Sequence, residues 1–119
     1  MSYVDGFVLP LPKKNLAAYR RMAKKAGAVW MEHGAVSYVE CLGDDTPSGK
    51  FTSFPQSVKL KEDEIVVFSW IVYKSRKHRD SVTKKVMSDP RLAEMMDPKN
   101  HPFDAKRMIF GGFKKLLEL

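Results

Sequence analysis

A carboxylate stands inside the first predicted strand, an unusual place for a charged side chain. Asp5 lies in SYVDGFVLP, residues 2–10. Burying an unpaired carboxylate is costly, so Asp5 must face a partner, a helix terminus or a cavity. One interpretation pairs Asp5 with Arg107 on the last predicted strand. The other makes Asp5 a general base in a pocket with Tyr38, Glu40 or Tyr73.

Among the histidines, His78 has the spacing that most favours chemistry. His78, Val82 and Val86 recur at four-residue steps on one side of a predicted helix, so His78 leans toward the core. There it can act as an axial ligand or proton carrier. The alternative is a partly buried, hydrogen-bonded histidine with a structural role, which is the commoner case.

Other catalytic and metal-binding patterns are absent from the sequence. Three scattered histidines and one cysteine form no zinc motif, and neither a glycine-rich phosphate loop nor a G-x-S-x-G turn occurs. Cys41 lies on a predicted strand, away from a helix start that would activate its thiol. The sequence therefore predicts no metal site and points to no particular cofactor.

The charge balance favours an anionic partner without requiring one. The chain has 119 residues and a formal net charge of +7, which is typical of many nucleic-acid-binding proteins. Cations gather on the first predicted helix, at Arg20, Arg21, Lys24 and Lys25. They can form a phosphate-binding ridge or simply a solvated helix face. We favour the second interpretation, and RNA binding stays an alternative.

The order of elements predicts an α+β domain over residues 1–119. Proline ends the first strand at Pro10 and Pro12, and Gly34 ends the first helix. Ser53 caps a helical turn inside a long loop at residues 44–63, and Ser75 caps the second main helix. The remaining elements are strands at 35–42, 64–73 and 106–113, a short helix after Asp89-Pro90, and a loop at 97–102. This β-α-β-β-α-β order is ferredoxin-like, with a four-stranded antiparallel sheet, central first and third strands, and both main helices on one face.

The stretch EIVVFSWIVY, residues 64–73, is apolar on both of its sides. The helices can cover only one face of the sheet, and an uncovered apolar face marks an interaction site. A second copy of the chain is the simplest cover, which predicts a homodimer. Periodicity does not say which of the candidate side chains face outward: Phe7, Leu9, Tyr38, Phe68, Trp70, Ile109 and Phe113.

Five motifs together resemble the YbaA-like family of small bacterial proteins of uncharacterised function. They are MSYVDGFVLPLP, ECLGDD, VVFSWIVYKSRKHRD, VMSDPRL and FDAKRMIFGGF. The resemblance covers nearly the whole chain and implies the dimeric α/β-barrel superfamily, in which two ferredoxin-like subunits pair their sheets. It implies no established activity. Some relatives carry a label that links them to signal-recognition-particle RNA.

The same superfamily contains small monooxygenases, and this implies an enzymatic alternative. Its haem-degrading members use an Asn on the first strand, a Trp on the third and a His on the following helix. Asp5 or Gly6, Trp70 and His78 occupy comparable elements here, although the Asn is missing. Trp70 can equally be a packing residue.

These observations predict a cytoplasmic homodimer that binds a small, partly apolar molecule between sheet and helices. A single cysteine fits a reducing compartment, and the sequence shows neither a signal peptide nor a membrane span. Residues 44–63 are expected to roof the pocket. Its expected lining residues are Tyr38, Glu40, Phe54, Tyr73 and Arg107.

Overall fold

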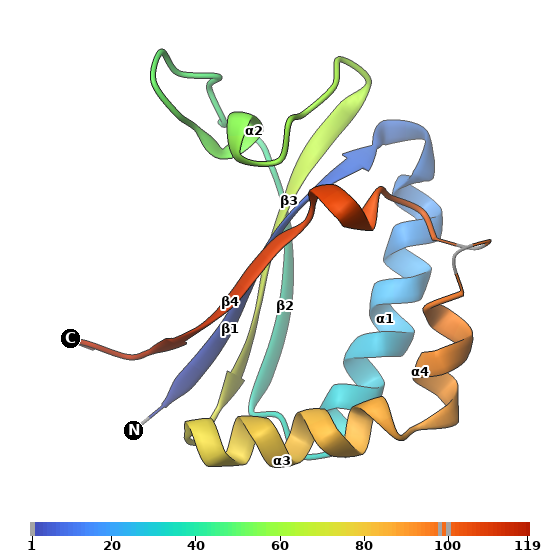
Figure 1. Cartoon of the computed structure of the whole chain (residues 1–119), viewed down its shortest axis with the longest axis vertical. Coiled ribbons are helices and arrows are strands. Elements are labelled where there is room, and N and C mark those ends of the chain that lie inside the picture. The colour runs from blue at the N-terminus through green and yellow to red at the C-terminus, as the bar shows by residue number, and fades with distance from the viewer. Residues whose placement is uncertain (1, 98, 100) are drawn as a thin grey trace.

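The computed structural model describes residues 2–97, 99 and 101–119, which form one sheet with helices packed on it. Its strands are β1 (Tyr3–Pro12), β2 (Ser37–Leu42), β3 (Glu64–Tyr73) and β4 (Ile109–Lys114). They are all antiparallel to their neighbours, in the order β2-β3-β1-β4. The main helices are α1 (Leu16–Glu32) and α3 (Arg76–Met87), and both lie on one side of the sheet (Figure 1). The predicted ferredoxin-like order and the central place of the first and third strands are confirmed.

Shorter elements complete the connections. They are a 3-10 turn η1 (Lys13–Asn15), helix α2 (Phe54–Ser57), helix α4 (Pro90–Met95) and a 3-10 turn η3 (Ala105–Arg107). The predicted caps are confirmed: Ser53 Oγ accepts the Gln56 amide hydrogen and Ser75 Oγ accepts that of His78. Gly34, with φ of 112°, follows the first helix in the conformation that favours glycine. The predicted loop at 97–102 falls partly outside the described residues.

Three predicted strand boundaries were wrong by two or more residues, and the first is the start of β2, which lies at Ser37 rather than at 35. β1 continues through Pro10 to Pro12 because β4 pairs only as far as Val8, so the proline stretch has a free edge where no amide donor is needed. β4 begins at Ile109 rather than at 106. The preceding residues form η3 instead, which starts where the Asp104 side chain accepts the Lys106 amide hydrogen.

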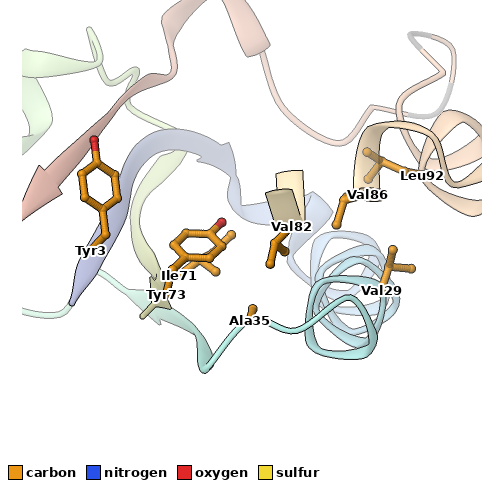
Figure 2. Close-up of a cluster of buried hydrophobic side chains, with 8 residues drawn as sticks. All are labelled: Tyr3, Val29, Ala35, Ile71, Tyr73, Val82, Val86 and Leu92. Carbon is orange, nitrogen blue, oxygen red and sulfur yellow. The ribbon is translucent and has the colours of Figure 1, made fainter. Parts of the chain in front are cut away.

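The helix face of the sheet carries most of the core. Figure 2 shows Tyr73 and Ile71 of β3 close to Val82 of α3, with Val29 of α1 and Leu92 of α4 beyond them. A second cluster joins Leu9, Leu11 and Val67 to Tyr19 and Ala23 of α1. The odd-numbered residues of β1 and β3 therefore face the helices.

Among the described residues, the opposite face, which we call the far face, is covered at one end only. The segment 44–63 folds over that end, where Val58 packs on Val8 and Val66, and it lies on the side away from α1 (Figure 1). Segment 44–63 thus does not roof a pocket between sheet and helices as we expected. The rest of the far face carries Phe68, Trp70, Ile109 and Phe113, whereas Phe7, Leu9 and Tyr38 face the helices.

Candidate functional site

A groove of about 470 Å³ opens between α1 and β2. Leu16, Ala23, Leu42 and Val67 contribute apolar surface to it. Arg20 and Lys24, both exposed, line it from the α1 side. The groove combines an apolar floor with a cationic rim, which is a common composition for sites that bind small molecules.

A carboxylate held by two phenols lies in this groove. The Tyr19 hydroxyl donates to Glu40 Oε1 at 2.7 Å, and the Tyr38 hydroxyl donates to Glu40 Oε2 at 2.8 Å. Tyr38 and Glu40 point the same way because alternate residues of a strand share a face, and Tyr19 reaches them from α1. Burial, reinforced by the Glu40 charge, raises the pKa of Tyr19 and of Tyr38 above the usual phenol value. We call these three residues the Tyr–Glu–Tyr cluster.

Gly27 of α1 makes room for this cluster. A Cβ atom at position 27 would lie 2.8 Å from a ring carbon of Tyr38, a distance that real Cβ contacts essentially never show. The Tyr38 ring also lies near Trp30, with ring centroids 6.2 Å apart. Close packing against α1 thus fixes Tyr38, and with it one of the two hydrogen bonds to Glu40.

The arrangement has a clear chemical capacity. Both phenols donate to Glu40, so their oxygens and the remaining lone pairs of the carboxylate can accept hydrogen bonds from a ligand. A carboxylate at the wall of an apolar groove can also accept a proton. The cations Arg20 and Lys24 can attract an anionic group at the rim.

Asp5 lies on the helix face, but it belongs to a different cluster. Arg79 Nη1 of α3 donates to Asp5 Oδ1 at 2.6 Å, and the guanidinium carbon lies 4.9 Å from the centroid of the Tyr3 ring. The partner of Asp5 is therefore Arg79 and not Arg107. Nearby, Trp30 Nε1 donates to the Tyr73 hydroxyl at 3.2 Å. Burial is the main cause of the raised pKa of Tyr73, and the Asp5 charge adds to it.

Arg107 instead forms an ion pair near the covered end of the far face. Its Nη2 donates to Glu64 Oε2 at 2.6 Å and its Nη1 to the Lys59 carbonyl at 2.9 Å. The hydrogen bonds from Arg107 hold the pKa of Glu64 below its usual value. The predicted pocket residue Phe54 also lies on this side, with its ring 5.8 Å from that of Phe68. Of the five predicted pocket residues, only Tyr38 and Glu40 line the groove.

The sheet separates Trp70 from His78. Trp70 pairs with Gly6 and Val39 and shares the far face with them, whereas His78 lies on α3 across the sheet, with its ring 6.1 Å from that of Tyr73. His78 Nδ1 accepts the Lys74 amide hydrogen at 3.0 Å. This arrangement does not fit a haem held between the two side chains. Within the described residues, no group of three histidine, cysteine, aspartate or glutamate side chains could hold a metal ion.

The four cations of α1 divide between two grooves. Arg20 and Lys24 line the groove beside β2, whereas Arg21 and Lys25 line a second groove between α1 and α4. All four side chains are exposed. They do not form one continuous ridge, although each pair could still contact an anion.

Two contributors to the site were not predicted as functional. Tyr19 fits the apolar stripe of α1, so its sequence signal is that of a core residue. Gly27 carries a weak signal, since a glycine inside a helix is unfavourable unless packing requires it. No local pattern indicates that Tyr19 and Glu40, which are 21 residues apart, share a hydrogen bond.

Comparison with known proteins places the chain among proteins without an assigned activity. A family model described as "Protein of unknown function (DUF1428)" matches residues 2–105. The chain is 49% identical to the uncharacterized protein YbaA of Escherichia coli K12 over 118 residues, 99% of each chain, and equally similar to YbaA of Shigella flexneri.

Solved structures share the fold at low sequence identity. SnoaB, a cofactor-independent oxygenase from Streptomyces nogalater, has a TM-score of 0.58 at 11% identity and covers 99% of this chain and 96% of its own. A nipsnap family protein of unknown function from Agrobacterium tumefaciens has a TM-score of 0.60 at 18% identity, with 96% and 87% covered. At such identities the likeness shows the fold alone, a four-stranded antiparallel sheet with helices on one face.

Proposed function

Because this chain belongs to the YbaA-like DUF1428 family, whose function is unknown, we propose a function from the site itself: a homodimeric protein that binds a small, partly apolar molecule in the groove between α1 and β2. The observation that carries the proposal is the Tyr–Glu–Tyr cluster inside an apolar groove. Two phenols and a carboxylate cost free energy to desolvate, and packing on Gly27 holds them beside open space.

The charges around the groove indicate the ligand class. Arg20 and Lys24 favour an anionic group at the rim, while Leu16, Leu42 and Val67 favour an apolar or aromatic body. Glu40 and its phenols would accept a hydroxyl or amide hydrogen from the ligand. An aromatic hydroxy acid has this combination of groups.

The observation that supports the proposed homodimer is the exposed apolar surface on the uncovered part of the far face. Phe68, Ile109 and Phe113 are 42%, 46% and 62% exposed, and Trp70 lies among them with its ring 5.6 Å from that of Phe68. An aromatic patch of this kind is typical of a protein interface.

A compartment that keeps Cys41 reduced, such as the cytoplasm, suits a chain with a single cysteine. The structure adds that, among the described residues, no helix is both long and apolar enough to cross a membrane.

A matched pair of variants tests the binding site. We would titrate 6-hydroxy-2-naphthoate, an aromatic hydroxy acid, and follow amide chemical shifts by NMR. Arg20→Glu with Lys24→Glu should weaken binding at least about tenfold, since each lost charge-assisted contact contributes about 1.5 kcal/mol. Arg21→Glu with Lys25→Glu makes the same change of charge on the other side of α1 and should leave binding unchanged. Equal weakening by both pairs would mean general charge attraction, and shifts confined to the far face would exclude the groove.

A second candidate is a cofactor-independent oxygenase, as SnoaB is described. The supporting observation is Glu40, a carboxylate positioned beside an apolar groove where it could remove a proton from a bound phenol. Oxygen consumption with electron-rich aromatic hydroxy acids as substrates would test it. The expected result for an enzyme is consumption that Glu40→Gln abolishes while the naphthoate still binds; no consumption across the panel would leave the binding function alone.

A further inference from the structure

The side chains of the Tyr–Glu–Tyr cluster offer the groove only hydrogen-bond acceptors. A carboxylate has no proton to give, so the contacts of 2.7 and 2.8 Å between Glu40 and the two phenols use the protons of Tyr19 and Tyr38. Each phenol has a single O–H, and both are therefore engaged with Glu40. The remaining lone pairs can accept a hydrogen bond from a ligand, but the three side chains keep no proton to donate.

Three features maintain this distribution of protons. Burial and the Glu40 charge raise the pKa of Tyr19 and of Tyr38 above the usual phenol value, so both phenols keep their protons at neutral pH. Close packing on Gly27 holds the Tyr38 ring with its hydroxyl beside Glu40. Both hydrogen bonds are charge-assisted, so a phenol that turned its proton to a neutral ligand would exchange a stronger bond for a weaker one.

The rim of the groove has the opposite polarity. Arg20 and Lys24 are donors without any acceptor atom, and α1 carries no acidic side chain before Glu32. A ligand that contacts both the rim and the cluster must therefore present an anion to the rim and a hydrogen-bond donor to the cluster. An ether oxygen beside Glu40 would place lone pairs against lone pairs, and the desolvated carboxylate would lack a partner there.

We propose that Glu40 is the specificity-determining residue of the groove, which selects aromatic acids with a hydroxyl or amino group at the end away from the carboxylate and rejects the corresponding ethers. Glu40 has this role because it engages both phenol protons. In Glu40→Gln, the amide oxygen would accept one phenol proton and the amide NH2 would donate to the other phenol, whose own proton could then turn to the ligand. This inference rests on the proposed function and deepens it by naming the ligand group that the site recognises.

Three naphthoates of similar shape test the selection in the full-length protein. The compounds 6-hydroxy-2-naphthoate and 6-amino-2-naphthoate can donate a hydrogen bond, whereas 6-methoxy-2-naphthoate can only accept one, and a groove of about 470 Å³ has room for each. NMR titration should show the two donors binding at least about tenfold more tightly than the ether. Equal binding of all three in the groove would overturn the selection and leave the proposed binding function standing, while no binding in the groove would overturn both.

Variants then assign the selection to Glu40. Glu40→Gln should reduce the preference for the donors to less than about threefold, chiefly because the ether binds more tightly. Glu94→Gln makes the same change of charge in the groove between α1 and α4 and should keep the wild-type preference. Tyr19→Phe keeps the ring and frees one Glu40 oxygen, so the donors should still be preferred. An unchanged preference in Glu40→Gln, or its loss in Tyr19→Phe, would contradict the role of Glu40.

Discussion

The two ends of the far face show opposite ways of covering one sheet. At one end, segment 44–63 folds over the strands, and Val58 and Val66 are 1% and 2% exposed. At the other end, Ile109 and Phe113 are 46% and 62% exposed, and Phe68 is 42% exposed although its ring lies 5.8 Å from that of Phe54 in the same segment. The same strands form both ends of the far face, so the two ends differ only in whether segment 44–63 reaches over them. The chain covers one end of this apolar face by itself, and the other end is the surface at which we propose that a second copy packs.

The largest expected effect is on dimerisation, and it comes from a charge placed at the uncovered end of the far face. Trp70→Asp should weaken the dimer by about a thousandfold, ~4 kcal/mol, because a desolvated carboxylate would replace a central aromatic side chain. Sedimentation velocity over a concentration series measures this. Met87→Asp, at an exposed apolar position on α3, serves as the control and should dimerise normally. A Trp70→Asp protein that stays dimeric would show that the open end is not the interface.

A substitution at the covered end of the far face should change the stability of the fold rather than dimerisation. Glu64 is 4% exposed in its side chain and binds Arg107 through both carboxylate oxygens. Glu64→Gln should lower the free energy of unfolding by about 3 kcal/mol, since the largely buried guanidinium of Arg107 then keeps only the more exposed Asp104 as a counter-ion. Urea unfolding measures the change, with the exposed neighbour Asp63→Asn as a control expected to stay within about 0.5 kcal/mol.

The same ion pair gives the covered end an acid dependence. Arg107 lowers the folded-state pKa of Glu64, so the contribution of Glu64 is present above its unfolded pKa, about 4.3, and is lost as pH falls through the lower folded value. Wild-type stability should therefore decline on acidification more steeply than that of Glu64→Gln. Parallel declines in the two proteins would show that other carboxylates dominate.

A further prediction concerns the helix face, which the chain covers without a partner. Gly27→Ala would place a Cβ 2.8 Å from the Tyr38 ring and should destabilise the fold by about 1–2 kcal/mol, even though alanine favours helices. Gly111→Ala is the control, since a Cβ there meets only the Phe113 ring at an ordinary 3.7 Å. Thermal unfolding compares them; a stabilised Gly27→Ala protein would mean that the Tyr38 ring moves freely.

The smallest effect is expected from one hydroxyl of the Tyr–Glu–Tyr cluster. Tyr19→Phe removes a hydrogen bond to Glu40 and should cost about 1 kcal/mol. Because the folded-state pKa of Tyr19 is raised, its contribution is present below the unfolded pKa of about 10 and is lost as pH rises beyond it. Stability of the wild type should fall more steeply than that of Tyr19→Phe above pH ~10. Ultraviolet difference absorbance during an alkaline titration follows this ionisation.

Local sequence patterns predicted where helices and strands begin and end better than they predicted on which face of the sheet a segment lies. The apolar run at 64–73 has the bounds of β3, and Ser53 and Ser75 cap the predicted helices, because strand length and capping depend on neighbouring residues. The side taken by segment 44–63 has no local signal, since a period of two residues divides a strand into faces without saying which one the helices cover.

Long-range pairs were also beyond local reasoning. Asp5 was correctly expected to need a partner, but Arg79 lies 74 residues away, on a helix whose orientation over the sheet no sequence period specifies. Tyr38 and Glu40 line one groove because they share a strand face, but the predicted pocket also included Tyr73, Phe54 and Arg107, which lie elsewhere. Tyr19 escaped notice because a buried tyrosine in an apolar stripe looks like a packing residue.

Pro10 and Pro12 limit where a further strand could pair with the sheet. The Val66 carbonyl accepts the Gly43 amide on the β2 side, so the opposing residue Pro10 directs its backbone nitrogen the other way, to the edge that β4 leaves free beyond Val8. A nitrogen without hydrogen cannot recruit another strand there. The stretch of β1 beyond Val8 is therefore protected against the addition of a further strand.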